Sequence, residues 1–242
     1  LQNGLTQTHQ NNMGAFGGPD IITDGLVLAL DAGSTRSYSG SGTTAYNIID
    51  NSSVSLLNGV GFSTANGGTW TLDGTDDYLQ GTITASTFSG ASTIGCWFYR
   101  ETITSWSGLV SNCVGTNSCA LLTFNGLSNQ IGINNAGVSA SGVFVDLGTN
   151  HLNKWIYCVL VISGSTSGSS VKVYAYEDGI LSTSTGSLSW NLNTTSDYYV
   201  SRHFHGATQT LDGNIPIAQV YNRALTAAEV TQNYNAQKNR FI

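Results

Sequence analysis

Three aspartates stand within five positions of one another in the segment Leu72-Asp73-Gly74-Thr75-Asp76-Asp77-Tyr78-Leu79. Carboxylates this close repel unless a cation or backbone amides compensate their charge, and oxygen ligands are those that Ca²⁺ prefers. Asp73, Asp76 and Asp77 are therefore candidate calcium ligands. The alternative is a turn whose aspartates accept hydrogen bonds from their own backbone amides. Spacing alone favours that turn, because calcium takes about six or more oxygens.

Two histidines and two tryptophans are the other candidate ligand-binding residues. In Ser201-Arg202-His203-Phe204-His205 the two imidazoles lie two positions apart, hence on one face of a strand. With Asp212 they suggest a metal site, whereas the plainer interpretation is a pair of solvated imidazoles at the end of a sheet. Trp106 and Trp190 flank predicted loops. Their rings suit either stacking on sugars or packing at the rim.

The sequence offers little for catalysis. Glycoside hydrolysis usually needs two carboxylates about 5–10 Å apart. The three glutamates, Glu101, Glu177 and Glu229, are far apart in the sequence, and two of them have structural roles, at a hairpin and at a helix cap. Gly164–Gly168 is a loose match to a nucleophile elbow in a low-complexity loop. We therefore assign no catalytic residue and expect no enzyme.

The four cysteines divide into two pairs. Cys113 and Cys119 either close a local disulfide or remain free thiols, and they match no zinc motif. Cys96 and Cys158 lie in apolar runs, where a free cysteine behaves as a small buried hydrophobe. The sequence does not decide whether either pair is bonded.

The composition favours strands over helices. Of 242 residues only 9% are charged, while 40% are hydrophobic and 29 are glycine. An average soluble domain has about 25% charged residues, and amphipathic helices need charged faces. The net charge of −6 argues against a nucleic-acid partner, and no apolar run reaches the roughly 18 residues that a membrane span needs.

Alternating runs bounded by turn residues recur along the chain from residue 21. We predict strands at Gly25–Asp31, Thr69–Asp73, Asp77–Ile83, Ser92–Arg100, Gly108–Cys113, Ala120–Phe124, Gln130–Asn134, Val143–Leu147, Lys154–Ser163, Ser170–Glu177, Tyr198–Arg202 and Gly213–Tyr221. Glu177-Asp178-Gly179 carries an Asp-Gly hairpin signal, and polar clusters such as Leu181–Ser187 are expected to connect strands. Thr226-Ala-Ala-Glu229 is a capping box that predicts one helix ending near Gln237.

These elements predict an all-β, two-sheet antiparallel sandwich with one short C-terminal helix. Residues 21–242 form one domain, and residues 1–20 are an extended polar arm. The arm begins without Met and lacks the features of a signal peptide. Whether a leader has been removed is left open.

Several stretches resemble concanavalin A-like, laminin G-like jelly rolls. They are Asp24–Tyr38 (Asp-Gly-Leu-Val-Leu-Ala-Leu-Asp-Ala-Gly), Leu72–Leu79, the aromatic strand Ser92–Arg100, the Trp-led Lys154–Ser163 and the terminal Leu211–Asn235. The likeness covers residues 21–242. The sequence of Thr23–Gly33 most resembles the corresponding segment in virion surface proteins of tailed phages, notably those of aquatic bacteria.

The resemblance implies binding of glycans or proteins through loops at one rim, often beside Ca²⁺. By position Asp76 matches the turn carboxylate of the family, with Asp73 and Asp77 beside it. Many members place further acids after a late Gly-x-Ile, where this chain has Pro216 and Ile217. Neither residue supplies a side-chain oxygen, so the departure weakens the expectation of calcium.

We weigh three functions. The first is a non-catalytic virion surface protein, a capsid decoration or fibre component, with a glycan-binding or adhesion role and with residues 1–20 contacting further copies or other virion proteins. The second is a secreted or cell-surface carbohydrate-binding or adhesion module. The third, a glycosidase or lyase, is disfavoured by the missing carboxylate pair. The expected location is the virion surface or the extracellular space.

Overall fold

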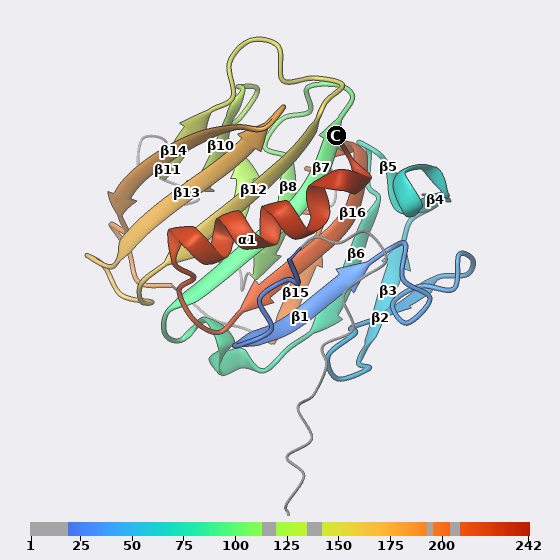
Figure 1. The fold of residues 1–242 in the computed structure, drawn as a ribbon, viewed down its shortest axis with the longest axis horizontal. Coiled ribbons are helices and arrows are strands. Elements are labelled where there is room, and N and C mark those ends of the chain that lie inside the picture. Colours follow the sequence, from blue (N-terminus) through green and yellow to red (C-terminus); the bar gives the residue numbers. More distant parts are fainter. Residues whose placement is uncertain (1–18, 113–119, 135–141, 193–195, 204–208) are drawn as a thin grey trace, which may run out of the picture.

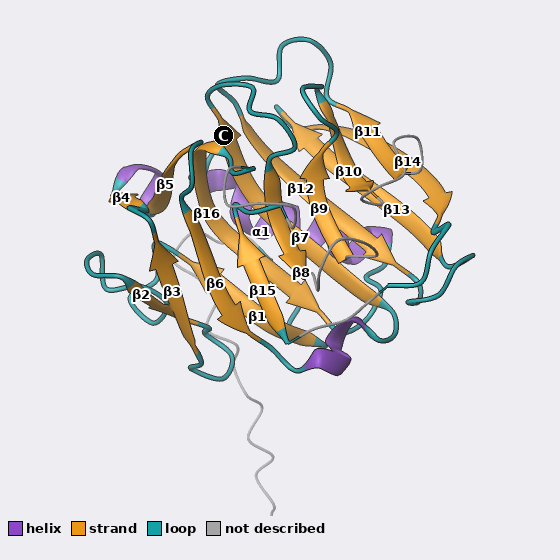
Figure 2. Cartoon of the chain, turned by 180° about the vertical axis from the view of Figure 1, so that it is seen from behind, coloured by secondary structure: helices purple, strands orange, loops and turns teal. Residues whose placement is uncertain are grey.

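The computed structural model of this chain describes residues 19–112, 120–134, 142–192, 196–203 and 209–242. Its strands form two eight-stranded antiparallel sheets packed as a sandwich (Figure 1, Figure 2), which confirms the predicted fold class. The strands are β1 (Leu26–Asp31), β2 (Thr44–Tyr46), β3 (Ser53–Leu57), β4 (Gly61–Ser63), β5 (Thr69–Asp73), β6 (Tyr78–Thr82), β7 (Ser92–Arg100), β8 (Gly108–Asn112), β9 (Ala120–Phe124), β10 (Gln130–Asn134), β11 (Gly142–Asp146), β12 (Trp155–Ile162), β13 (Ser170–Glu177), β14 (Ile180–Ser187), β15 (Asp197–Val200) and β16 (Asp212–Tyr221). The helices are α1 (Ala227–Gln237) and the 3₁₀ turns η1 (Ala65–Gly67), η2 (Ala85–Phe88) and η3 (Lys238–Arg240).

The two sheets differ in what lies on their outer faces. One sheet has the order β14-β13-β12-β7-β16-β5-β4, with β1 also paired to β16, and α1 lies across it (Figure 1). We call it the covered sheet. The other has the order β11-β10-β9-β8-β15-β6-β3-β2, and no described helix crosses its outer face (Figure 2). We call it the open sheet.

The core lies between the sheets, as period-two alternation requires. Leu79 and Tyr198 of the open sheet and Ile94 and Leu160 of the covered sheet are each 0% exposed. Burying one leucine or isoleucine side chain contributes about 1.5–3 kcal/mol to the free energy of folding. The inward residues of each strand therefore fix the register, and the residues between them point to the outer faces.

A second apolar cluster joins α1 to the covered sheet. Trp97 of β7 is fully buried beneath the helix, and Tyr234 of α1 stacks on Tyr176 of β13 with ring centroids 4.0 Å apart. The predicted capping box is confirmed: the Glu229 amide donates to Thr226 Oγ1 at 3.3 Å, and the Thr226 amide donates to the Glu229 carboxylate at 2.7 Å. The cap starts the helix where its apolar face meets the sheet.

The prediction that Leu181–Ser187 connects strands is wrong. This segment lies within β14, the edge strand that pairs with β13 from Ser170↔Ser187 to Glu177↔Ile180. The Asp-Gly turn before it is confirmed, since Asp178 and Gly179 have φ angles of 49° and 79°, as a type I′ hairpin requires. The backbone bonds to β13 hold the strand, so its exposed Ser and Thr side chains need no apolar pattern.

Cys96 and Cys158 are free, fully buried thiols on neighbouring strands, paired directly in the register of β7 and β12. Burial raises the pKa of both thiols. They are small core hydrophobes, as predicted. Cys113 and Cys119 lie outside the described residues. Across the described ranges no helix has the length and apolar character of a membrane span.

Candidate functional site

Strand ends gather acidic residues at one end of the sandwich, which we call the acidic end. In the covered sheet β5 stops at Asp73 and β16 starts at Asp212, and these two residues are cross-strand partners. The turn after Asp73 crosses to Tyr78, the first residue of β6 in the open sheet. Eight of the 14 acidic residues lie at this end, namely Asp73, Asp76, Asp77, Glu101, Asp146, Glu177, Asp178 and Asp212. Such a field attracts cations and repels polyanions.

The three predicted calcium ligands meet at this turn. Oxygens of Asp73, Asp76 and Asp77 all lie within 4.8 Å of one another. Asp73 Oδ1 accepts from the amide of Thr75 at 2.8 Å, so an Asx-turn is present as well. The two interpretations of this segment are therefore compatible.

Asp77 is the unusual member of the three. Its side chain is only 4% exposed, Oδ2 accepts from the Asp73 amide at 3.2 Å, and buried Oδ1 has no hydrogen-bond partner. Burial, together with the charges of Asp73 and Asp76, raises the pKa of Asp77 against the effect of that amide. A buried, unpartnered carboxylate oxygen beside two further carboxylates is a feature that a bound cation would satisfy.

Trp106 and His203 come together at the same end. Their ring centroids are 5.8 Å apart, and Trp106, with φ 56°, donates its amide to the Gly126 carbonyl at 3.0 Å. Trp106 is half-buried, so part of its ring remains available to a ligand. His203 is 2% exposed, which rules out the expected solvated imidazole for this residue. The cause is packing between the loops before β8 and after β15.

Trp190 lies away from this site, after β14, which ends at the opposite end of the sandwich. It is 8% exposed and belongs to the core cluster between the sheets. Its position fits the packing alternative rather than stacking on a sugar. His205 lies outside the described residues. Among the described residues, the group of three or more side chains that could hold a metal is the aspartate turn.

The structure also shows a surface that sequence reasoning missed. On the outer face of the open sheet, the guanidinium of Arg202 lies over the rings of Tyr78 and Tyr199, with Cζ 4.7 Å and 4.8 Å from their centroids. Gln80 shares this face, because it lies two residues after Tyr78 in β6 and directly opposite Tyr199 of β15. We call Tyr78, Gln80, Tyr199 and Arg202 the tyrosine platform. All four side chains are partly exposed.

Alternation could have indicated part of this platform. Tyr78 and Gln80 alternate with core Leu79, and Tyr199 alternates with Tyr198 and Val200. Arg202 follows the end of β15 and lies outside this alternation. The pairing of β6 with β15, which brings the two tyrosines together, carries no local signal in the sequence.

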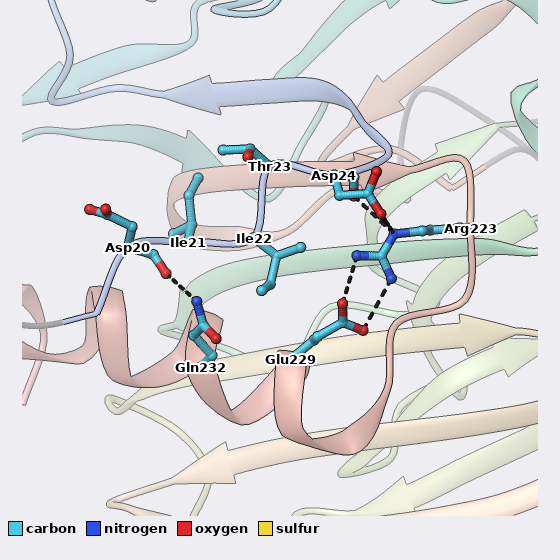
Figure 3. A pocket seen from close by; sticks show the side chains of 8 residues that line it. All are labelled: Asp20, Ile21, Ile22, Thr23, Asp24, Arg223, Glu229 and Gln232. Carbon is cyan, nitrogen blue, oxygen red and sulfur yellow. Dashed lines mark hydrogen bonds and ion pairs between the residues drawn. The ribbon is translucent and has the colours of Figure 1, made fainter. Parts of the chain in front are cut away.

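A polar groove of about 740 Å³ lies on the other side of the molecule, between the segment 20–24 and α1 (Figure 3). Gln232 Nε2 donates to the Asp20 carbonyl at 2.8 Å, and Arg223 makes ion pairs with Asp24 at 2.9 Å and Glu229 at 2.7 Å. The one guanidinium of this groove is therefore already paired with two of its three carboxylates. Its contacts fix the start of the described chain against the helix.

Residues 73–231 match the Laminin_G_3 model, described as the concanavalin A-like lectin/glucanases superfamily. The chain belongs to this superfamily. The match spans more than half of the chain, and it includes both the aspartate turn and the tyrosine platform. It confirms the predicted laminin G-like domain. No curated protein matches the sequence.

Solved structures share the fold at low identity. The binding domain of botulinum neurotoxin serotype G is 15% identical with a TM-score of 0.62, covering 86% of this chain and 50% of that one. A Trypanosoma rangeli sialidase bound to 2,3-difluorosialic acid is 16% identical with a TM-score of 0.64, covering 93% and 35%. The binding domain of botulinum neurotoxin DC in complex with SialylT is 12% identical with a TM-score of 0.62, covering 88% and 52%. This chain thus spans about a third to a half of those chains, and the likeness shows the fold alone.

Proposed function

We propose that this protein is a non-catalytic, glycan-binding surface protein that binds its ligand on the outer face of the open sheet and the adjoining acidic end. The asymmetry of the two sheets is the observation that carries the proposal. On the covered sheet α1 buries outward aromatic residues at the centre, including Trp97, while Tyr99 and Trp155 at one end stay partly exposed. On the open sheet the tyrosine platform stays partly exposed, and no described helix crosses it.

The platform has the chemistry that sugars need. A tyrosine ring offers an apolar face to the C–H groups of a sugar, and its hydroxyl serves the ring substituents. The Gln80 amide offers both donors and an acceptor. Trp106, half-buried at the acidic end, adds a further ring. Membership of the concanavalin A-like lectin/glucanases superfamily is compatible with this proposal, and two structural neighbours were solved with 2,3-difluorosialic acid and with SialylT.

Calcium fits the aspartate turn. The three carboxylates and the unpartnered Oδ1 of Asp77 supply hard oxygen ligands, which this ion prefers. Asp73, Asp76 and Asp77 would hold the ion, with backbone carbonyls or water completing its shell. Because Asp77 directly precedes Tyr78, an ion here would also stiffen the start of β6 beneath the platform.

The absence of catalysis is part of the proposal. A glycosidase places its two carboxyl groups on either side of the scissile bond. Asp73, Asp76 and Asp77 belong to one turn rather than to two facing elements, so they would approach a ligand from one side. We expect no release of reducing ends from polysaccharides that the protein binds. Hydrolysis of a bound polysaccharide would contradict this expectation if substitution of a single Asp or Glu abolished it.

Binding is tested on a glycan array with the full chain. We expect retention of specific glycans, with Tyr199→Ala reducing affinity about tenfold, which corresponds to the loss of about 1.4 kcal/mol of contact with the ring. Tyr199→Phe keeps the ring and serves as the matched control, so it should retain most of the binding. If the wild-type chain binds no glycan, the proposed function is wrong.

We further propose that the protein is displayed on a virion, with its polar N-terminal residues contacting neighbouring subunits. The support is the resemblance of Thr23–Gly33 to tailed-phage surface proteins, and the position of segment 20–24, which is held against α1. Deleting residues 1–18 keeps those contacts, so the domain should melt at an unchanged temperature while assembly, followed by light scattering and particle imaging, is impaired. Normal assembly of the truncated chain, or a monomeric wild type that binds glycans, would favour the secreted adhesion module instead.

A further inference from the structure

We infer that Arg202 anchors a carboxylate-binding site on the open sheet, and that the glycans bound there carry an acidic sugar such as a uronic or sialic acid. The inference rests on the proposed glycan-binding function and narrows it to one substrate class. Arg202 alone would recognise the negative charge of the ligand. The preference for acidic glycans can therefore be lost while binding of glycans in general remains.

Aromatic residues from two strands hold the guanidinium of Arg202 in position. Tyr78 comes from β6 and Tyr199 from β15, and their rings meet edge to face with centroids 6.1 Å apart. Arg202 lies within 4.7 Å and 4.8 Å of both centroids. Two aromatic contacts restrict the rotamers of a long side chain, so the cation is held in place before any ligand arrives.

The backbone beneath this side chain is also fixed. Ser111 Oγ donates to the Arg202 carbonyl at 2.8 Å, and Arg202 bridges to Thr210. Gly108 packs so closely that a Cβ there would lie 2.3 Å from the carbonyl carbon of Arg202. A residue with a side chain at position 108 would displace the chain that carries the guanidinium.

The charge of Arg202 has no acidic partner among the described residues. The ion pairs of the described chain involve Lys154, Arg223 and Arg240 instead. Arg202 Nε is buried without an acceptor, and no hydrogen bond joins either Nη atom to another described residue. A preorganised arginine with free donors, in a protein that has a net charge of −6, is complementary to an external anion.

The surroundings favour a carboxylated sugar over other anions. The planar guanidinium binds a carboxylate through two parallel hydrogen bonds. A polyphosphate or nucleic acid needs several cations, and here it would meet the acidic end nearby. A sugar acid presents a single negative charge on a ring that can lie against Tyr78 or Tyr199, with Gln80 in reach of its hydroxyls.

The test uses the full chain and matched pairs of glycans, each with one acidic sugar beside its neutral counterpart: sialyllactose with lactose, and a disaccharide that ends in a single glucuronate with its methyl ester. We expect the wild type to prefer the acidic member by about tenfold or more. Arg202→Met should weaken binding of the acidic member much more than binding of the neutral parent, so that the preference between the two disappears. Arg202→Lys keeps the charge without the fork and should fall between them. Lys172→Met, which removes a cation lying over Tyr174 on the other sheet, is the matched control.

Melting temperatures of each variant establish that it is folded. Equal binding of acidic and neutral partners by the wild type, or a preference that survives Arg202→Met, would overturn the inference while the glycan-binding function stands. A wild type that retains no glycan of either kind would overturn both. A preference for sulfated or phosphorylated sugars over carboxylated ones would also contradict the assignment.

Discussion

Arg100 Nη1 lies 3.4 Å from His151 Nε2 inside the acidic end, where the two side chains are 0% and 3% exposed. An arginine N–H can only donate, so Nε2 must accept. The ring proton is then on Nδ1, which lies 3.2 Å from the Gly148 carbonyl oxygen. His151 is therefore neutral in the folded protein. It ties the loop before β12 to the end of β7.

The pair makes stability depend on pH. Burial lowers the pKa of His151, and the nearby charge of Arg100 adds to this effect, although the Gly148 carbonyl opposes it. In the unfolded chain the histidine titrates near its ordinary value of about 6.5. The folded state thus binds fewer protons, so its stability is complete above about pH 6.5 and is lost as the pH falls through the lower folded pKa.

We expect the free energy of unfolding of the wild type to fall by up to about 1.4 kcal/mol per pH unit from this group below about pH 6.5. His151→Gln keeps an acceptor for Arg100 but does not titrate, so its unfolding free energy should fall less steeply. Urea denaturation of both proteins between about pH 7.5 and 5 measures the difference. Identical slopes for the two proteins would show that His151 does not contribute.

The effect of replacing Asp77 on thermal stability should depend on calcium. Because its Oδ1 is buried without a partner, Asp77→Asn should stabilise the protein in EDTA by about 1 kcal/mol, which raises the melting temperature by about 2–4 °C. Calcium should then raise the melting temperature of the wild type but not that of the variant. Asp20→Asn, an exposed change of the same charge, is the control. Equal stabilisation of wild type and Asp77→Asn by calcium would place the ion elsewhere.

At Tyr234, where α1 contacts the covered sheet, the contribution of ring packing to stability can be measured apart from that of hydrogen bonding. Tyr234 stacks on Tyr176 and on Trp97, yet its buried hydroxyl has no hydrogen-bond partner. Tyr234→Phe should therefore be neutral or slightly stabilising. Tyr234→Ala should lose about 3–5 kcal/mol, because it leaves a cavity beneath the helix. Guanidinium denaturation measures both. A cost for Tyr234→Phe as large as that for Tyr234→Ala would mean that the hydroxyl matters.

Sequence patterns predicted correctly those elements whose bounds are determined by residues close to one another in the sequence. The predicted strands Ser92–Arg100 and Ser170–Glu177 coincide with β7 and β13, because apolar runs and turn residues mark both ends. The same holds for the helix that begins after Thr226, whose start is determined by its capping box. The aspartate turn was identified for the same reason, as its residues are neighbours in the sequence.

Features that depend on distant pairing were missed. β2 and β4 have only three residues each, too few for a period, and polar β14 is held by its bonds to β13. The platform needs β6 beside β15, a pairing that no single stretch of sequence encodes. His203 is buried by loops packed from other parts of the chain. Each of these features is determined by tertiary contacts.

The thiols of Cys96 and Cys158 give a prediction about reactivity. The thiolate is the form that reacts, and burial raises the pKa of both groups, so neither ionises appreciably near neutral pH. In the native protein we expect neither cysteine to react with a maleimide, and both to react after unfolding in guanidinium. Peptide mapping by mass spectrometry distinguishes them from Cys113 and Cys119. Labelling of Cys96 or Cys158 at a rate similar to that of a free thiol under native conditions would show that β7 and β12 separate readily, contrary to their position at the centre of the covered sheet.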